Sequence, residues 1–209
     1  MATAEITSPR RWWARSRAWI GITIIAPFAA VGLFSSPLVL ADSWYHCGLE
    51  VAGWLFFLAG ALMRWWSTLY IGGRKYHELV SDGPYSICRN PLYVGTFFLG
   101  LSIPLYLGSI TFAVGFAAAS IFYLAVTVPV EESNLRANIG PEFDAYCLRT
   151  PRFLPNFRSY KSPRHVNVDT LGLRAEAWRA ARYLWIPAIC EIISYARDEA
   201  WWPHTWHLP

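Results

Sequence analysis

Long stretches without a charged side chain dominate the hydrophobic pattern of this sequence. Residues 18–41 contain none, and a helix needs about 20 apolar residues to cross the hydrocarbon core of a bilayer. This stretch therefore predicts a first membrane helix, kinked at Pro27. A second span is predicted at about 44–66, with Glu50 and Arg64 near its ends. We expect both charged groups to reach the membrane interface, Arg64 by snorkelling.

The next uncharged stretch is too long for one helix. It runs from Asn90 to Val130, which is 41 residues. As a single helix it would be about 60 Å long, twice the thickness of the hydrocarbon core. The chain must fold back, and the turn-forming residues Pro104, Gly108 and Ser109 lie near the middle. The sequence therefore predicts a helical hairpin, with a third span at 91–106 and a fourth at 109–130.

The distribution of Lys and Arg predicts the orientation of these spans. The arm before the first span has four Arg, the loop between the second and third spans has three cations, and the segment after the fourth is basic. The other two connections have no Lys or Arg. By the positive-inside rule, both termini and the 72–90 loop are predicted to be cytoplasmic, which an even number of spans satisfies.

After Val130 the chain becomes polar. A short helix is predicted at 131–139 and another from 141 to about 148, since Gly140-Pro141 interrupts the pattern and Pro is tolerated at a helix start. Residues 171–182 have the pattern of a basic amphipathic helix. The apolar run 183–196 is only 14 residues long, too short to span, and is expected to lie in the interface.

These elements together predict an all-α membrane protein with about four transmembrane helices. The chain divides into a basic cytoplasmic arm at 1–17, a membrane domain at 18–157, which includes a cytoplasmic C-terminal segment, and an amphipathic interfacial tail at 158–209. Composition agrees, because 55% of the residues are hydrophobic and 15% charged, against about 25% charged in an average soluble domain. A soluble globule of this size would expose a large apolar surface.

Composition also limits the function classes. The net charge of +4 is explained by cations that flank apolar segments, so no nucleic-acid partner is expected. The four cysteines are scattered singly, without a C-x-x-C pair or a His at metal-ligand spacing. A metal site or a disulfide framework is therefore not expected.

Two polar clusters should meet on the cytoplasmic side. The first, GPYSICRNPLYVG at 83–95, precedes the predicted hairpin, and the second, at 128–155, follows it. Because the hairpin returns the chain to the same face, its ends can lie one helix–helix distance apart, about 8–10 Å. Arg89 and Glu132 are therefore predicted to line one shared cavity.

These two clusters resemble the isoprenylcysteine carboxyl methyltransferase family and its phospholipid methyltransferase relatives. The family pattern is G-x-Y-x-x-x-R-H-P-x-Y-x-G, an apolar hairpin, E-E with a Leu three residues on, F-G-x-E-Y-x-x-Y, and a Pro-bounded basic piece. The matching positions in this chain are Gly83, Tyr85, Arg89, Pro91, Tyr93, Gly95, Glu131, Glu132, Leu135, Gly140, Glu142, Tyr146, Pro151, Arg152 and Pro155. Asn90 replaces the family His, and Ile139 and Phe143 replace Phe and Tyr. The resemblance covers about 44–157.

The resemblance implies an enzyme that uses S-adenosyl-L-methionine at the cytoplasmic membrane face. Its cofactor-binding residues would be Tyr85, Arg89, Asn90, Pro91, Tyr93, Glu131, Glu132 and Tyr146, and its catalytic residues Glu132, Arg136 and Arg152. The chemistry is consistent, because carboxylates accept hydrogen bonds from ribose or an amine. An Arg can pair bidentately with a carboxylate, and tyrosine rings can face a cation or adenine.

The methyl acceptor is left open by the sequence. A carboxylate acceptor is already ionised and needs a cation to hold it, whereas an amine or a thiol must lose a proton, which a Glu would take. The leading expectation is an isoprenylcysteine carboxyl O-methyltransferase, with a phospholipid N-methyltransferase or a small-thiol S-methyltransferase as alternatives. A non-catalytic membrane scaffold or sensor is an alternative of another class, and Asn90 favours it most because Asn cannot transfer a proton.

Overall fold

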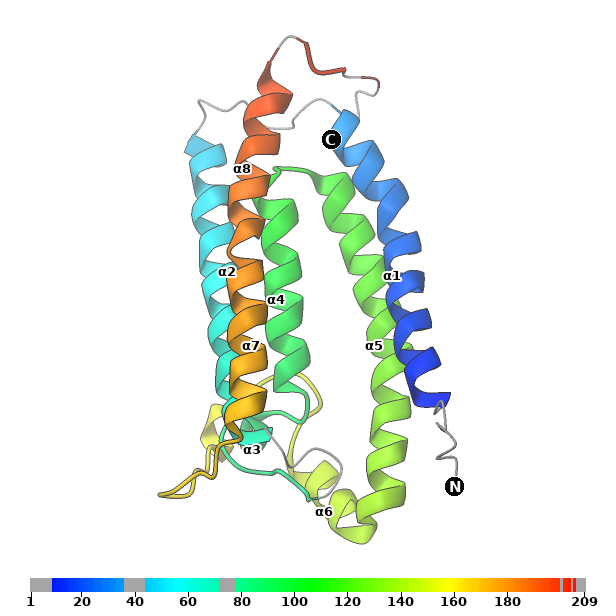
Figure 1. Cartoon of the computed structure of the whole chain (residues 1–209), viewed down its shortest axis with the longest axis vertical. Helices are drawn as coiled ribbons and strands as arrows, with labels where there is room; N and C mark the ends of the chain where they lie inside the picture. The colour runs from blue at the N-terminus through cyan, green and yellow to red at the C-terminus, as the bar shows by residue number, and fades with distance from the viewer. Residues whose placement is uncertain (1–8, 36–43, 72–77, 200, 204, 206–209) are drawn as a thin grey trace, which may run out of the picture.

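The computed structural model describes residues 9–35, 44–71, 78–199, 201–203 and 205, with side chains from residue 20 onward. Within these ranges the chain forms helices and no sheet. The long helices are α1 (Pro9–Phe34), α2 (Trp44–Ile71), α4 (Pro91–Tyr106) and α5 (Ile110–Ile139), which stand side by side (Figure 1). Short elements gather at the lower end of the bundle in that view: α3 (Pro84–Ile87), α6 (Pro141–Arg149) and the 3-10 turn η1 (Phe157–Ser159).

The predicted helical hairpin is present as α4 and α5. The turn between them holds Gly108, whose φ of 55° lies in the left-handed region that glycine adopts without steric cost. Ser109 then caps α5 by accepting a hydrogen bond from the Phe112 amide at 3.2 Å. The polar segment expected as a separate helix at 131–139 is instead the last part of α5, which continues past Pro129 and ends at Gly140.

Two of the helices, α2 and α5, are long and apolar enough to cross a membrane. The apolar part of α1 that the structure describes, Ile20–Phe34, and α4 are shorter, and predicted first-span residues 36–41 lie outside the described ranges. Large apolar side chains point outward from α2 and α5, among them Leu55, Leu62 and Ile121. An apolar outer surface of this kind suits a lipid environment.

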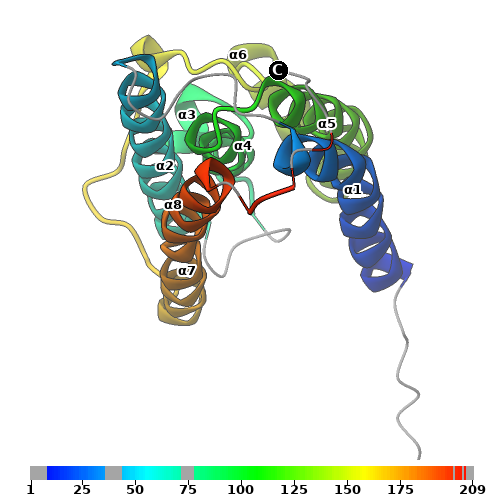
Figure 2. The ribbon, with the colours of Figure 1, turned by 90° about the horizontal axis from the view of Figure 1, so that it is seen from above.

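The bundle consists of two helix pairs, and the two helices of each pair pack against each other through small residues. Viewed from above (Figure 2), α1 pairs with α5 on one side, and α2 pairs with α4 on the other. A Cβ atom at Gly115 of α5 would lie 2.3 Å from Cβ of Phe28 in α1, and one at Gly60 of α2 would lie 2.7 Å from the Gly95 carbonyl oxygen in α4. Membrane helices use such residues to bring their backbones together.

The C-terminal helices differ from the predicted interfacial tail. Helices α7 (Thr170–Tyr183) and α8 (Trp185–Asp198) stand end to end along α2 and α4 (Figure 1). Each is short, but only Leu184 separates them and Pro187 lies in the first turn of α8, where its missing N–H is tolerated. Their summed length is about 42 Å, so the stack reaches the upper end of the bundle.

Arg197 anchors this stack at the upper end. Its guanidinium donates to the Leu107 carbonyl at 2.7 Å and to the Ser35 carbonyl at 3.0 Å, just beyond the C-terminal ends of α4 and α1. The Thr205 amide then donates to the Phe34 carbonyl at 3.0 Å. Pro9, by contrast, lies at the lower end (Figure 1). The predicted topology required the two ends of the described chain to lie on the same face, and they lie at opposite ends of the bundle.

Candidate functional site

Two loops at the lower end hydrogen-bond to each other through their backbones. Gly83, with φ of 58°, begins the first loop, and a Cβ there would lie 2.4 Å from the Tyr70 ring. The Arg89 amide donates to the Pro151 carbonyl at 2.8 Å, and the Asn156 amide donates to the Ile87 carbonyl at 2.9 Å. This pairing brings the segment after α6 against the start of α4 and places Arg152 near Arg89.

A cavity of about 310 Å³ lies above these loops. Its walls come from the last part of α2, the α3 loop, the first turns of α4, the part of α5 from Tyr123 to Ile139, and α6. The lining residues are Arg64, Ile71, Glu78, Leu79, Val80, Tyr85, Arg89, Asn90, Leu92, Tyr93, Thr96, Tyr123, Glu131, Glu132, Leu135, Ile139, Phe143 and Tyr146. The two sequence clusters that flank the hairpin therefore meet in one space.

Glu132 is the centre of the charged groups in this cavity. Its side chain is 8% exposed, and its Oε1 atom lies 3.3 Å from Nη1 of Arg89. Arg152 donates to the same carboxylate through Nη2 to Oε2 at 2.5 Å and through Nε to Oε1 at 3.2 Å. One carboxylate between two guanidinium groups leaves a net positive charge, which suits an anionic ligand group.

Two buried polar atoms in the cavity wall have no hydrogen-bond partner within the described chain. They are the hydroxyl of Tyr85 and Nε of Arg89. Burial, and secondarily the nearby Tyr146 and Glu131, raises the pKa of Tyr85 well above its ordinary range, so this phenol stays protonated and able to donate. Buried donors without partners are costly, and a bound ligand that accepts from both would remove that cost.

Tyr146, which also lines the cavity, makes a hydrogen bond that supports the backbone of Tyr85. Tyr146 donates from its hydroxyl to the Tyr85 carbonyl at 2.6 Å. Burial is the main cause that raises the pKa of Tyr146, while the Arg89 charge lowers it. Tyr146 therefore fixes the backbone that presents Tyr85, and its ring forms part of the wall.

The other end of the cavity lies deeper along the bundle. Tyr93 donates to Oε2 of Glu131 at 2.5 Å, and its ring meets the Tyr123 ring at a centroid distance of 5.9 Å. Tyr123 precedes Glu131 by eight residues on α5, which is about 12 Å along the helix axis. The cavity thus extends from the polar loops into the apolar part of the bundle.

Most of the residues predicted from the sequence line this cavity. They are Tyr85, Arg89, Asn90, Tyr93, Glu131, Glu132 and Tyr146. Pro91 is buried at the first position of α4 without lining it. Arg152 acts on the wall through Glu132, and the Asn90 side chain donates to the Arg152 carbonyl at 3.2 Å. Arg136 is not brought to the cavity, because its half-exposed side chain pairs with Asp144 at 2.6 Å.

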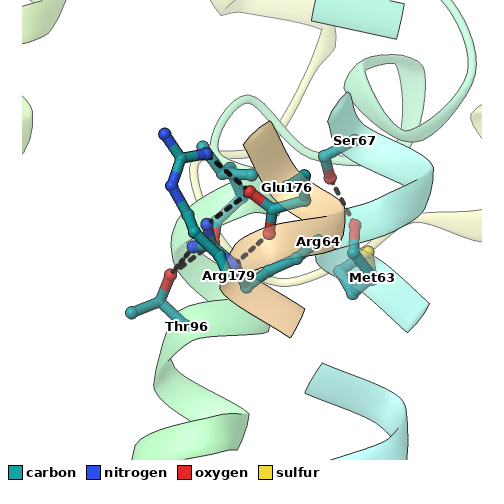
Figure 3. A network of polar contacts seen from close by, with 7 residues as sticks. Met63, Arg64, Ser67, Thr96, Glu176 and Arg179 are labelled. Atoms are coloured by element: carbon teal, nitrogen blue, oxygen red, sulfur yellow. Dashed lines mark hydrogen bonds and ion pairs between the residues drawn. The ribbon is translucent and has the colours of Figure 1, made fainter. Parts of the chain in front are cut away.

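Three lining residues were missed at the deeper end: Arg64, Thr96 and Tyr123. Arg64 was expected to snorkel to the interface, yet it is buried, and its guanidinium pairs with Glu176 of α7 at 2.7 Å (Figure 3). The signal in the sequence was a cation inside an apolar helix, where a charge requires a partner. That partner lies 112 residues away in the chain.

The chain is similar in sequence to several known proteins and to one protein family. The phospholipid methyltransferase family matches residues 49–140. The nickel-cobalt-cadmium resistance protein NccN of Alcaligenes xylosoxydans xylosoxydans is 32% identical over 93% of this chain and 91% of its own length. The cobalt-zinc-cadmium resistance protein CzcN of Cupriavidus metallidurans is 33% identical over 80% of this chain and 72% of its own.

The similarity to a relative whose name states an enzymatic activity covers less of the chain. The protein-S-isoprenylcysteine O-methyltransferase B of Arabidopsis thaliana is 30% identical over 39% of this chain and 41% of its own length. No solved structure matches the chain. Among the residues described, no group of three or more His, Cys, Asp or Glu side chains is placed to hold a metal ion.

Proposed function

Because this chain belongs to the family of membrane methyltransferases that includes the phospholipid and isoprenylcysteine enzymes, we propose that it transfers a methyl group from S-adenosyl-L-methionine to a lipophilic or small acceptor. The observation that carries the proposal is the cavity in which Arg89, Glu132 and the unpartnered Tyr85 hydroxyl meet. Its volume of about 310 Å³ is at the lower end of the range for small-molecule sites, about 300–1,000 Å³.

The donor set of the cavity fits this methyl donor. The Arg89 Nε and the Tyr85 hydroxyl are the groups that would receive its amino-acid carboxylate, since both are buried donors without partners. Glu131 and Glu132 offer carboxylate oxygens to an amine or to ribose hydroxyls. Tyr93 and Phe143 supply aromatic wall for an adenine or a cation. When bound, the donor supplies a methyl group on a positively charged sulfur.

The residues of the chain contribute positioning and exclusion of water. Methyl transfer is an in-line displacement, so the barrier falls when acceptor and methyl group are held in line. The Arg89–Glu132–Arg152 group fixes the polar end of the cavity through the contacts at 3.3 Å and 2.5 Å. Apolar side chains such as Leu92, Leu135 and Ile139 line the remainder and exclude water.

For the acceptor, we propose an isoprenylcysteine-type carboxylate as the leading case, with a phospholipid amine or a small thiol as alternatives. The isoprenylcysteine O-methyltransferases of three eukaryotes are among the relatives and support a carboxylate acceptor. The family that matches residues 49–140 is named for phospholipid methyltransferases and supports an amine acceptor. The cavity supports either, because a carboxylate can be held by a guanidinium, and Glu131 lies at the wall to take a proton from an amine or thiol.

We further propose that the protein is multi-pass and that the cavity end faces the cytoplasm, where the methyl donor is dissolved. The cations near this end, including Arg149, Arg158, Lys161 and Arg164, support that orientation. The α7–α8 stack runs along the bundle beside the four predicted spans. It places Thr205 at the opposite end from Pro9.

A physiological role in metal tolerance is a second proposal. It rests on NccN and CzcN, whose names state metal resistance and whose similarity extends over most of this chain. In this proposal the methylated product, rather than a metal bound to the protein, provides the tolerance. A strain that lacks the gene, complemented with wild-type protein or with Glu132→Ala, should grow on nickel or cobalt only with the wild type. Equal growth with both would separate tolerance from methyl transfer.

The central experiment is a titration of the detergent-purified protein with S-adenosylhomocysteine. We expect saturable binding by the wild type and a loss of at least tenfold in affinity for Glu132→Ala, because the ligand loses a carboxylate acceptor and Arg89 and Arg152 lose the group that positions them. Glu191→Ala, which removes an exposed carboxylate on α8, is the matched control and should bind normally. Absence of binding by the wild type would favour the scaffold alternative.

The acceptor requires a separate measurement. Membranes that contain the protein are incubated with the methyl-tritiated donor, and the label is followed into lipid, protein or a volatile product. Label in a base-labile protein ester would support the carboxylate case, label in phospholipid the amine case, and a volatile product the thiol case.

A further inference from the structure

A second group of two arginines and one glutamate borders the deeper end of the cavity. Glu176 of α7 is 1% exposed and receives Nε and Nη2 of Arg64 at 2.7 Å and 3.0 Å. Arg179 donates to the same carboxylate at 2.7 Å. Figure 3 shows Arg64 between Glu176 and Thr96, and Arg179 donating to Oε2, the same oxygen that accepts from Nη2 of Arg64. The group carries a net positive charge although Arg64 and Glu176 are buried.

Arg64 is the member of this group that lines the cavity. Its Nη1 donates to the Thr96 hydroxyl at 2.6 Å, and that hydroxyl donates to the Leu92 carbonyl at 2.9 Å. A guanidinium has five N–H groups, and the contacts to Glu176 and Thr96 use three of them. One N–H on each terminal nitrogen is left for a further acceptor at the cavity wall.

The position of Arg64 distinguishes it from the polar end of the cavity. It precedes the end of α2 at Ile71 by seven residues, about 10 Å along the helix axis. Its partner Thr96 follows Asn90 by six residues, about 9 Å along α4. A charge at such depth is costly unless it is paired or functional. The pair with Glu176 compensates one charge, and the excess positive charge of the group remains.

We propose that Arg64 binds the anionic group of the methyl acceptor, a lipophile with a carboxylate or a phosphate, and that Glu176 is the positioning residue that holds Arg64 at the cavity wall. This inference rests on the methyltransferase function proposed above. The cavity then has two cationic ends, with Arg89 for the methyl donor and Arg64 for the acceptor. In a carboxylate acceptor the reacting oxygen would lie at Arg64 itself. In a phosphate acceptor the reacting nucleophile would lie between the two ends, beside Glu131 and Tyr93.

The proposal makes the C-terminal helices part of the site. Glu176 and Arg179 lie on α7, outside residues 49–140 that match the phospholipid methyltransferase family. The similarity to NccN, by contrast, extends over 93% of this chain. The acceptor end of the cavity is therefore completed by an element that this chain shares with such relatives and that the family match does not include.

The test uses three probes with the same chain and different head groups: dodecanoate, dodecyl phosphate and dodecan-1-ol. Each is titrated by calorimetry into the full-length protein in micelles of an uncharged detergent, with S-adenosylhomocysteine at saturation and protein-free micelles as the blank. We expect at least one anion to bind the wild type at least tenfold more tightly than the alcohol, as a hydrogen-bonded charge pair gives. The anion that binds more tightly distinguishes a carboxylate acceptor from a phosphate acceptor.

The variants locate the effect. Arg64→Gln should lose the preference for the anion, whereas Arg174→Gln, which removes an exposed cation from α7, should keep it. Glu176→Gln removes the carboxylate that holds Arg64 at the cavity wall, so its preference for the anion should fall, while Arg174→Gln should keep the wild-type preference. If Arg64→Gln does not fold, Arg64→Lys, which retains the charge, should fold and keep the preference.

The possible results separate this inference from the proposed function. A wild-type protein that binds S-adenosylhomocysteine but binds the anions no better than the alcohol would overturn the role of Arg64 and leave the methyltransferase proposal intact. A preference that persists in a folded Arg64→Gln variant would have the same meaning. Failure to bind S-adenosylhomocysteine would count against the proposed function itself.

Discussion

Gly60 of α2 and Gly95 of α4 face each other at backbone distance. A Cβ at Gly60 would lie 2.7 Å from the Gly95 carbonyl oxygen, and a Cβ at Gly95 would lie 2.9 Å from the Gly60 carbonyl oxygen and 2.8 Å from Cγ of Arg64. The close approach of the two helices therefore also sets the position of Arg64 at the cavity. Gly95 belongs to the motif shared with the methyltransferase family, and the structure gives it a packing role.

This contact predicts that neither glycine tolerates a methyl group. Gly60→Ala or Gly95→Ala forces the helices apart, and overpacking of this kind costs about 1–3 kcal/mol. Gly48→Ala is the matched control on α2, because nothing lies within 4 Å of its added Cβ and Ala is the better helix former. Thermal unfolding in detergent should show a lower midpoint for the first two variants and an unchanged or higher one for the third. Equal midpoints for all three would contradict the backbone contact.

A second prediction concerns the hydroxyl groups of two buried tyrosines. Tyr85→Phe removes a donor that has no partner in the described chain, so the protein should be as stable as the wild type or more stable. Its affinity for S-adenosylhomocysteine should fall about three- to tenfold, the value of one hydrogen bond. Tyr146→Phe instead removes the bond to the Tyr85 carbonyl and should cost about 1 kcal/mol of stability. Thermal unfolding and calorimetric titration of both variants measure the difference, and a Tyr85→Phe protein with unchanged affinity would remove this hydroxyl from the site.

The structure separates two arginines that the sequence placed together. Arg152→Ala leaves the buried Glu132 with Arg89 as its remaining cation, so methyl transfer should fall at least tenfold. Arg136→Ala breaks an ion pair in which both side chains are 53% exposed, so water screens the interaction and its loss should matter little. Its activity should stay within about twofold of the wild type. Incorporation of tritiated methyl groups into membranes measures both, and the opposite ranking would return Arg136 to the reaction.

The sequence predicts the parts of this fold that depend on local composition. An uncharged stretch of 41 residues must fold back on any physical account, and this requirement alone brings the segments around Arg89 and Glu132 to one end of the bundle. The turn at Gly108 and Ser109 is likewise a local property, because a left-handed residue and a capping hydroxyl are required there.

What could not be predicted depends on contacts between distant segments. Helices α7 and α8 are each too short to span, and only their end-to-end stacking and the contacts of Arg197 with the Leu107 and Ser35 carbonyls place them along the bundle. Arg64 looked like an interfacial anchor for the same reason, since its partner Glu176 lies on the segment that was placed elsewhere. A charge whose partner is far away in sequence carries no local signal of burial.

The last prediction uses Cys88, which lies between Tyr85 and Arg89 and is fully buried. Burial is the main cause that raises the pKa of its thiol from an ordinary 9.0 to about 11, and a backbone hydrogen bond from Asn90 opposes it. A raised pKa in the folded state means that folding favours the protonated thiol. The contribution of Cys88 to the stability of the fold is therefore complete below about pH 9 and is lost as the pH rises toward 11.

The thermal unfolding midpoint should decrease as the pH is raised from 9 to 11, and it should decrease less in Cys88→Ala, which cannot titrate. Cys47, which is exposed, gives the control, because Cys47→Ala should show the same alkaline loss as the wild type. If Cys88→Ala and Cys47→Ala lose stability equally as the pH rises, the Cys88 thiol is not the group responsible.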